Sequence, residues 1–230
     1  MGFENDILSM KKLLYKNRYF FVPYTIFLLI CGILLLLLPK TELHILSNEA
    51  NSPFFDSFFR YATYLGDGAM IAVMFVILLF TKYRYAFIFL TASLLTALIV
   101  NLFKKVILHG MYRPSKYFEL YESYQLHLVE GVKLHSLQSF PSGHTATAFN
   151  LFLMMALMVK NNLLKFIFFT MAILVAYSRV YISQHFLVDI TVGSVIGISL
   201  IVIIWLWFET WNKNWLNHSV IRHSEHWHDK

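Results

Sequence analysis

Long apolar stretches dominate this 230-residue chain and restrict it to folds that are stable in a lipid bilayer. Hydrophobic residues make up 58% of it and charged residues only 14%, which is not the composition of a soluble domain. A bilayer leaves backbone polar groups no partner except the chain itself, and a helix of about 20 apolar residues satisfies them. We therefore expect an all-α, polytopic membrane protein with six transmembrane helices. The six apolar stretches are residues 19–39, 66–81, 84–103, 144–160, 164–178 and 189–209.

The chain begins with a short basic segment that leads into the first apolar stretch. Four basic residues between positions 11 and 18 give it the look of a signal peptide. No small-residue cleavage site follows, so we expect the stretch to be retained as the first helix. Cys31 is the only cysteine, which excludes an intramolecular disulfide. The expected division is a cytoplasmic segment at 1–18, a six-helix membrane domain at 19–209 and a cytoplasmic tail at 210–230.

Lysine and arginine in the short loops predict the orientation, because cytoplasmic loops are enriched in both. They concentrate in the N-terminal segment, near residues 82–84 and 160–165, and in the tail. We therefore expect both termini in the cytoplasm of a cell with a bacterial-type inner membrane. Six spans then put the basic segment 104–143 outside, against the charge rule, and binding of an anion would explain its charge. Its basic residues are Lys104, Lys105, Arg113, Lys116 and Lys133.

Three polar motifs converge at the outer ends of these spans. The sequence Pro-Ser-Gly-His at 141–144 opens the fourth span, Ser178 and Arg179 end the fifth, and residues 185–189 open the sixth. Ionisable groups at a membrane boundary are costly and indicate a functional site.

His185 and Asp189 are four residues apart and share a face of a helix. A carboxylate bonded to one imidazole nitrogen fixes the tautomer and leaves the other nitrogen as a nucleophile. The pair taken alone is equally consistent with a purely structural contact.

The motif at 141–144 suits an anion at a helix start. Ser142 can cap the helix, Gly143 allows backbone N–H groups to approach an anion, and His144 can protonate a leaving oxygen. An ordinary helix cap followed by an incidental histidine is the alternative.

Arg113 and Arg179 offer planar donors that match phosphate oxygens. Both could instead be topology or lipid-headgroup arginines, and Ser178 could bind an oxygen or simply end a helix.

Taken together, Arg113-Pro114, Pro-Ser-Gly-His at 141–144 and Ser-Arg-x5-His-x3-Asp at 178–189 resemble the three-part signature of the type 2 phosphatidic acid phosphatase family. The resemblance covers residues 66–205 and implies six helices, metal-independent hydrolysis of phosphate esters and a phosphohistidine intermediate. It implies that His185 is the nucleophile, Asp189 its orienting partner and His144 the general acid. The phosphate-binding set that we expect is Ser142, Gly143, Ser178, Arg113, Arg179 and an upstream lysine.

The first motif departs from the family pattern, which has six residues between the lysine and Arg-Pro. Seven residues separate Lys105 from Arg113, and eight separate Lys104 from it. A loop through His109-Gly110 could absorb the difference. We favour Lys105 as the ligand, with Lys104 as the alternative.

Four further features lie outside the motifs. Residues 53–65 form an amphipathic pattern that suits an interfacial helix or a loop helix packed on the bundle. Asp67 is expected to cap the second span, and residues 115–140 to form an outer lid or to carry interfacial aromatic anchors. The tail histidines, which suit a solvated tail better than a metal site, are His218, His223, His226 and His228.

These observations predict a lipid-phosphate phosphatase that acts at the outer face of the membrane without a metal or other cofactor. Candidate substrates are undecaprenyl diphosphate, phosphatidylglycerophosphate, phosphatidic acid and lipid A. The expected partners are this substrate and membrane lipids, and not nucleic acid, because the basic residues behind the net charge of +6 flank apolar stretches. A lipid phosphotransferase or a non-catalytic transporter or scaffold is the alternative. A vanadium haloperoxidase would have a similar pocket but is soluble.

Overall fold

The computed structural model describes residues 2–221, and every regular element in that range is a helix. The all-α expectation is confirmed. In chain order the elements are α1 (Gly2–Lys16), α2 (Arg18–Leu37), α3 (Lys40–Glu49), α4 (Pro53–Ala62), η1 (Thr63–Gly66), α5 (Gly68–Leu79), α6 (Tyr83–Leu102), the π-helical turn η2 (Phe103–Ile107), α7 (Pro114–Tyr121), α8 (Gly143–Met158), α9 (Asn162–Tyr181), α10 (Leu187–Glu209) and η3 (Asn214–Asn217).

Each of the six apolar stretches contains a helix, but not all of these helices are long enough to cross a bilayer alone. Four helices are long and apolar enough to cross a membrane: α2, α6 with η2, α9 and α10. A fifth crossing is possible if α4–η1 and α5, which meet at a bend of 56°, form one broken span. The 16 residues of α8 extend only about 24 Å at 1.5 Å per residue, short of a hydrocarbon core of about 30 Å. Length and composition therefore support four or five of the six expected spans in an integral membrane protein.

Helix α8 is the centre of the bundle. It packs against α9, α10 and α6, and most of its side chains are buried. This burial explains why the sequence of so short a helix is apolar throughout, because its side chains face other helices on all sides.

The crossing of α8 and α10 is close because α10 carries glycines four residues apart. A Cβ atom on Gly193 would lie 2.5 Å from the carbonyl oxygen of Ser142, and one on Gly197 would overlap that of Ala146. Small residues at this spacing let two helix backbones approach each other in membranes. Gly66 makes a similar approach, since a Cβ atom there would lie 2.6 Å from the carbonyl oxygen of His144. The start of α8 is thus held between α10 and η1.

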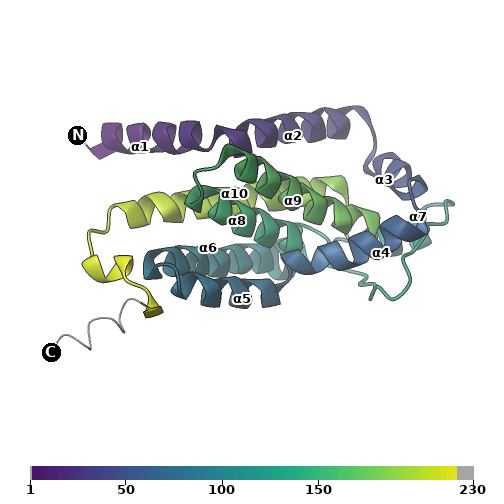
Figure 1. Ribbon diagram of the computed structural model, residues 1–230. Helices are drawn as coiled ribbons and strands as arrows, with labels where there is room; N and C mark the ends of the chain where they lie inside the picture. The colour runs from purple at the N-terminus through teal and green to yellow at the C-terminus, as the bar shows by residue number, and fades with distance from the viewer. Residues whose placement is uncertain (1, 222–230) are drawn as a thin grey trace.

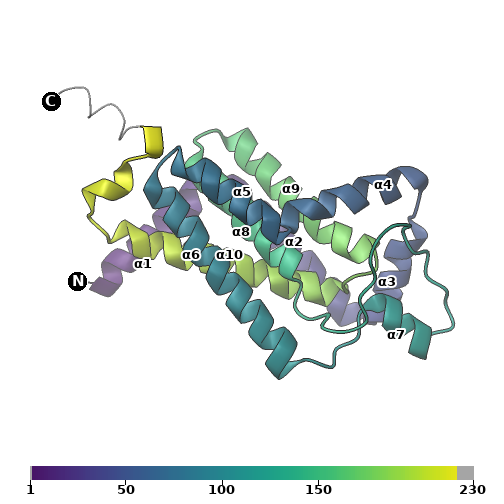
Figure 2. The same cartoon turned by 90° about the horizontal axis from the view of Figure 1, so that it is seen from below.

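The long helices run along a common direction, and the two ends of the bundle differ (Figure 1). Helix α1 and the segment after α10 lie at one end. Helices α3, α4 and α7 and the long connection between α7 and α8 lie at the other, which Figure 2 shows from below. The three motifs lie at this second end, so the expected convergence of the motifs is present in the fold.

The amphipathic segment forms α4, which Ser52 caps by accepting a hydrogen bond from the backbone N–H of Phe55 (3.3 Å). Phe59 is buried against the rings of Tyr177 and Tyr181 on α9, whereas Phe54 is 70% exposed. The helix therefore packs on the bundle along one edge and presents other phenylalanines outward.

Replacement of Gly197 by alanine tests the close crossing. We expect Gly197→Ala to destabilise the protein by about 1–3 kcal/mol, because the backbone of α8 has to move to admit the methyl group. Gly32→Ala is the matched control, since nothing lies within 4 Å of a Cβ atom there and alanine favours a helix by about 1 kcal/mol. Thermal unfolding in detergent measures both, and equal melting temperatures would contradict the tight contact.

Candidate active site

A cavity of about 410 Å³ lies where the three motifs meet. Lys104 and Arg113 come from the first motif, His144 from the second, and Arg179 and His185 from the third. The loop residues Lys133 and His135 and the η1 segment complete the wall. The cavity therefore combines three histidines and several cations, and His144 and His185 are the two that the sequence predicted to meet there.

His185 lies in the short connection between α9 and α10 and is 1% exposed. Its Nδ1 atom lies 3.3 Å from Oδ2 of Asp189, in the first turn of α10. The backbone N–H of His185 donates to the carbonyl of Arg179 (3.0 Å), which folds the connection back onto α9. Because Nδ1 faces the carboxylate, Nε2 is the ring nitrogen left for the cavity.

Burial, reinforced by the cations Lys104, Arg113 and Arg179, holds the pKa of His185 well below its ordinary value. The imidazole is therefore neutral at neutral pH, with Nε2 unprotonated when Nδ1 donates to Asp189. This is the form that a nucleophile requires.

Asp189 is almost fully buried and receives two donors besides His185. The backbone N–H of Phe186 donates to its Oδ2 atom at 2.9 Å, and the hydroxyl of Ser139 donates to the same oxygen. Ser139 lies in the loop before α8 and was not among the predicted residues. Its position close to the second motif was the only sequence signal, and the contact with the third motif depends on tertiary structure.

His144 occupies the first turn of α8. Ser142 is the cap and accepts from the backbone N–H of Thr145 at 3.4 Å, while its own N–H donates to the carbonyl of Asp189 at 3.0 Å. The N–H groups of Gly143 and His144 have no intrahelical acceptor, because they precede the first complete turn. The helix start therefore offers backbone donors beside an imidazole.

Arg179 lies in the last turn of α9 and is 6% exposed. One guanidinium nitrogen donates to the hydroxyl of Thr63 at 2.6 Å, whereas its Nε atom has no partner among the described residues. An unsatisfied buried donor on a cation is costly and suits an anionic ligand.

Arg113 is held from two sides at the start of α7. Its Nε atom donates to the carbonyl of Leu137 (3.0 Å), and Nη1 donates to the side-chain oxygen of Gln184 (2.6 Å). Thr63 and Gln184, like Ser139, were not predicted, because each acts by orienting a motif residue from another part of the chain.

Lys104, and not Lys105, lines the cavity. Lys105 is exposed and does not contribute to the wall. Both belong to the π-helical turn η2, which inserts an extra residue into the end of α6 and changes the direction of the following side chains. The expected phosphate ligand is therefore corrected from Lys105 to Lys104. The extra residues between this lysine and Arg113 are accommodated by η2 and the loop before Arg113.

Two predicted phosphate ligands lie behind the cavity wall. Ser178 is fully buried and donates to the carbonyl of Val175 at 2.6 Å, within its own helix. The hydroxyl of Ser142 is likewise taken up by the cap of α8, where it accepts from the hydroxyl of Thr145 at 2.9 Å. Neither residue is part of the cavity lining, so both support the elements that carry the histidines and Arg179.

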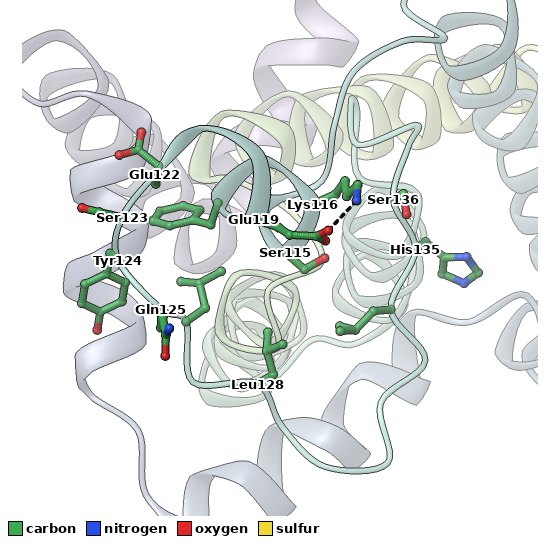
Figure 3. Close-up of a pocket in the computed structure, with 13 residues that line it drawn as sticks. Ser115, Lys116, Glu119, Glu122, Ser123, Tyr124, Gln125, Leu128, His135 and Ser136 are labelled. Atoms are coloured by element: carbon green, nitrogen blue, oxygen red, sulfur yellow. Dashed lines mark hydrogen bonds and ion pairs between the residues drawn. The ribbon is translucent and has the colours of Figure 1, made fainter.

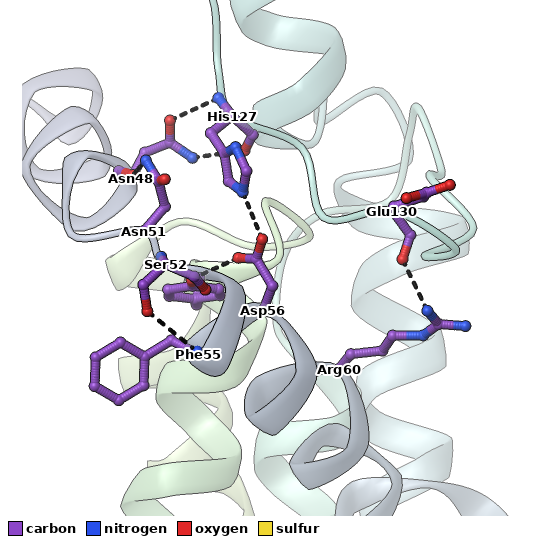
Figure 4. Close-up of polar contacts among 9 residues, drawn as sticks. Asn48, Asn51, Ser52, Phe55, Asp56, Arg60, His127 and Glu130 are labelled. Carbon is purple, nitrogen blue, oxygen red and sulfur yellow. Dashed lines mark hydrogen bonds and ion pairs between the residues drawn. The ribbon is translucent and has the colours of Figure 1, made fainter.

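The connection between α7 and α8 is fastened over the site by polar contacts (Figure 4). Asn48 exchanges two hydrogen bonds of 2.8 Å with the backbone of His127, whose Nε2 atom lies 2.9 Å from Asp56. Arg60 donates to the carbonyl of Glu130 at 3.1 Å. The segment 115–140 thus packs as a cover at this end of the bundle, and the rings of Tyr117 and Tyr121 on α7 lie 5.1 Å apart at a tilted angle.

The remaining expectations concern residues near the site or in the tail. Asp67 occupies the cap position of α5 without a side-chain capping bond, and it lines the cavity instead. His218 is described, whereas His223, His226 and His228 lie outside the described residues. Among the side chains that the structure describes, those of residues 7–221, no group of three metal-ligating residues is close enough to hold a metal ion.

Comparison with known proteins assigns the chain to a superfamily and supports a membrane phosphatase. A family model described as the PAP2 superfamily matches residues 85–213, more than half of the chain, and the chain belongs to this superfamily. A comparison with curated proteins gives no match.

Two crystal structures have the same fold. The structure of Aquifex aeolicus LpxE is similar with 29% sequence identity and a TM-score of 0.62, over 71% of this chain and 92% of that chain. The first transmembrane PAP2 type phosphatidylglycerolphosphate phosphatase from Bacillus subtilis is similar with 22% identity and a TM-score of 0.60, over 85% of this chain and 98% of that chain. The latter likeness concerns the fold alone.

The neighbouring lysines of η2 provide a test of the cavity. We expect Lys104→Gln to weaken the binding of orthovanadate about 10- to 100-fold, which corresponds to the 1.5–3 kcal/mol of a hydrogen bond to a charged group. Lys105→Gln is the matched control and should change the affinity by less than about twofold, because an exposed charge is screened by solvent. Isothermal titration of the protein in detergent measures both. A larger effect at Lys105 would restore the original assignment.

Proposed function

We propose that this protein is a lipid-phosphate phosphatase that works through a phosphohistidine intermediate. The observation that carries the proposal is the neutral, buried His185, which is fixed by Asp189 and faces a cavity lined by Arg179, whose buried Nε atom has no partner among the described residues. A nucleophile beside unsatisfied cations suits an electrophile that brings its own negative charge, as a phosphate group does.

In the first step, Nε2 of His185 attacks phosphorus, and the bond from phosphorus to the leaving oxygen breaks. His144 donates a proton to that oxygen, so the lipid leaves as an alcohol or as a lower phosphate. Lys104, Arg113 and Arg179 would stabilise the charge on the equatorial oxygens. Asp189 stabilises the imidazolium that forms as Nε2 bonds to phosphorus.

In the second step, water attacks the phosphohistidine, and the bond between nitrogen and phosphorus breaks. His144, now unprotonated, accepts the proton from the water and is ready for the next cycle. Inorganic phosphate leaves and His185 returns to its neutral form. His144 thus carries both proton transfers, to the leaving oxygen and from the attacking water, and the cycle requires no metal-bound water.

An apolar cleft beside the site supports a lipid as the substrate. It measures about 580 Å³ and lies between α4 and α9, where Phe58, Leu65 and Val175 contribute to its lining. Val175 also lies against Gly66 of η1, which borders the catalytic cavity. A lipid chain in this cleft would have its phosphate near Arg179.

We further propose that the site lies on the outer side of an inner membrane, with both termini in the cytoplasm. The charge pattern of the loops supports this orientation, and α1 and η3 lie at the end of the bundle opposite the site (Figure 1). In this arrangement α5 and α8 cross together with flanking elements, which gives six membrane passages.

Phosphate release from a panel of phosphatidic acid, phosphatidylglycerophosphate and prenyl phosphates in detergent tests the proposed function. Wild-type protein should release phosphate from at least one of them, and His185→Ala should abolish release from all. Release that persists in His185→Ala would exclude the phosphohistidine route.

The role of His144 depends on the leaving group. We expect His144→Ala to lower kcat about 10²–10⁴-fold for an alkyl phosphate, the usual contribution of a general acid. The loss should be much smaller for an aryl phosphate such as p-nitrophenyl phosphate, because its leaving oxygen is a weak base. Steady-state kinetics on both esters measure the difference, and equal losses would remove the acid role.

Ser139 is expected to position the Asp189–His185 pair. Ser139→Ala should lower kcat about tenfold, as expected when a charged acceptor loses a hydrogen bond of about 1.5 kcal/mol, and Ser139→Thr should restore most of it. Rapid-quench kinetics should show slower formation of the phosphohistidine with little change in KM. A rise in KM at constant kcat would instead indicate a role in substrate binding.

A further inference from the structure

The catalytic cavity contains more positive charge than one phosphate group requires. Asp67 is the only carboxylate among its lining residues. Among the side chains of residues 7–221, no carboxylate oxygen lies within 4 Å of any of the lining lysines or arginines. A phosphate monoester brings at most about two negative charges. The lining cations are Arg60, Lys104, Arg113, Lys133 and Arg179.

These cations occupy two levels. Arg113 and Arg179 are 9% and 6% exposed and surround His185 on the inside, together with Lys104. Lys133 and His135 are exposed and lie on the connection between α7 and α8, at the mouth of the cavity. The proposed reaction uses the inner level and assigns no role to the outer one.

The backbone of the outer level is fixed to the inner site. Gln184, next to His185, donates from its side chain to the carbonyl of Lys133 at 3.3 Å. Arg113 binds the carbonyl of Ser136 through its backbone N–H at 2.9 Å and that of Leu137 through Nε at 3.0 Å. These bonds fix the backbone on both sides of His135, beside the cavity that Lys133 and His135 line, which lowers the backbone entropy lost on binding.

Gly131 completes the turn that leads to these residues. It has a φ angle of +74°, and its Cα lies so close to Arg60 that a Cβ atom would be 2.6 Å from the guanidinium carbon. The left-handed φ angle favours glycine here, and its missing side chain leaves room for the guanidinium of Arg60 beside the turn. The guanidinium lies against the turn, where it donates to the carbonyl of Glu130 at 3.1 Å, and it contributes to the cavity lining.

The electrostatic surroundings of His135 agree with this arrangement. Partial burial lowers the pKa of His135, and the charges of Arg113, Lys133, Arg179 and Lys104 lower it further. Its imidazole is therefore a neutral hydrogen-bonding group within the positive field of both levels.

We propose that Lys133 and His135 form a second anion subsite for a second phosphate of the same substrate. The substrate class is then a lipid diphosphate, with its terminal phosphate among the inner cations and the phosphate next to the lipid at the mouth. The inference rests on the proposed function and specifies its substrate. The cavity of about 410 Å³ has the size of a small-molecule site, so both phosphates fit one continuous space.

The subsite would also act on the leaving group. His185 attacks the terminal phosphorus, the bond from that phosphorus to the bridging oxygen breaks, and His144 protonates this oxygen. The product that leaves is the lipid monophosphate, whose charge Lys133 stabilises while it develops. Water then releases inorganic phosphate from His185, as in the proposed cycle.

Methylphosphonate and methylenediphosphonate form a matched pair of ligands that resist hydrolysis and differ by one phosphonate group. Isothermal titration of wild-type protein in lipid-free detergent should give at least about tenfold tighter binding of the diphosphonate. Lys133→Gln should remove most of this preference, and Lys133→Arg should retain it. Equal affinities for both ligands in wild-type protein would overturn the proposal.

Lys116 supplies the control, because it lies on the same cover but outside the catalytic cavity. It forms an ion pair of 2.7 Å with Glu119 in a neighbouring pocket of about 510 Å³. Figure 3 shows this pair, with the ring of His135 turned away from the other residues of that pocket. Lys116→Gln should leave the preference for the diphosphonate unchanged. A loss as large as that of Lys133→Gln would indicate a general effect of surface charge and overturn the subsite.

Turnover of farnesyl phosphate and farnesyl diphosphate separates this proposal from the proposed function. We expect wild-type protein to have a higher kcat/KM for the diphosphate than for the monophosphate. Lys133→Gln should lower this preference, the quotient of the two kcat/KM values, about tenfold. Hydrolysis of both substrates with the same ratio in wild type and variant would refute the subsite and leave the phosphatase intact. If neither were hydrolysed, the proposed function would fail, while the phosphonate titration would still decide whether the subsite exists.

Discussion

Positive charge that is held in a confined space without ion pairs is the constraint on which the site depends. Lys104, Arg113 and Arg179 repel one another, and within the described chain no carboxylate forms an ion pair with them. The fold offsets this repulsion with neutral acceptors, namely the hydroxyl of Thr63, the amide of Gln184 and the carbonyl of Leu137. These contacts orient the guanidinium groups without cancelling their charge, so the cavity stays attractive to an anion.

The sequence was sufficient to predict the helical fold and the convergence of the motifs. The length of the apolar stretches indicates helices directly. The proximity of His144 and His185 follows because both lie at or just before helix starts on the same side of the bundle. The count of crossings was less secure, because an apolar stretch such as that of α8 can be buried by neighbouring helices as well as by lipid. Hydrophobicity alone does not separate these two environments.

The parts of the site that were not predicted depend on local geometry or on distant contacts. The change from Lys105 to Lys104 follows from a π-helical turn, which alters the direction of side chains without a clear sequence signal. Ser142 and Ser178 have the expected positions, but their hydroxyls bond within their own helices. Ser139 and Asp189 are 50 residues apart in sequence, so local sequence patterns do not indicate that they form a hydrogen bond.

The hydrogen bond from the backbone of Ser142 to the carbonyl of Asp189 joins the helix of His144 to the helix of Asp189. The glycines of α10 hold the same two helices at close range a little deeper in the bundle. The spacing between His144 and His185, the proposed acid and nucleophile, is therefore set by the bundle interior, whereas Lys133 and His135 belong to the connecting loop. Substitutions in the loop could then change which headgroup is bound without changing the distance between the two histidines. Substrate specificity and catalytic chemistry could therefore evolve separately.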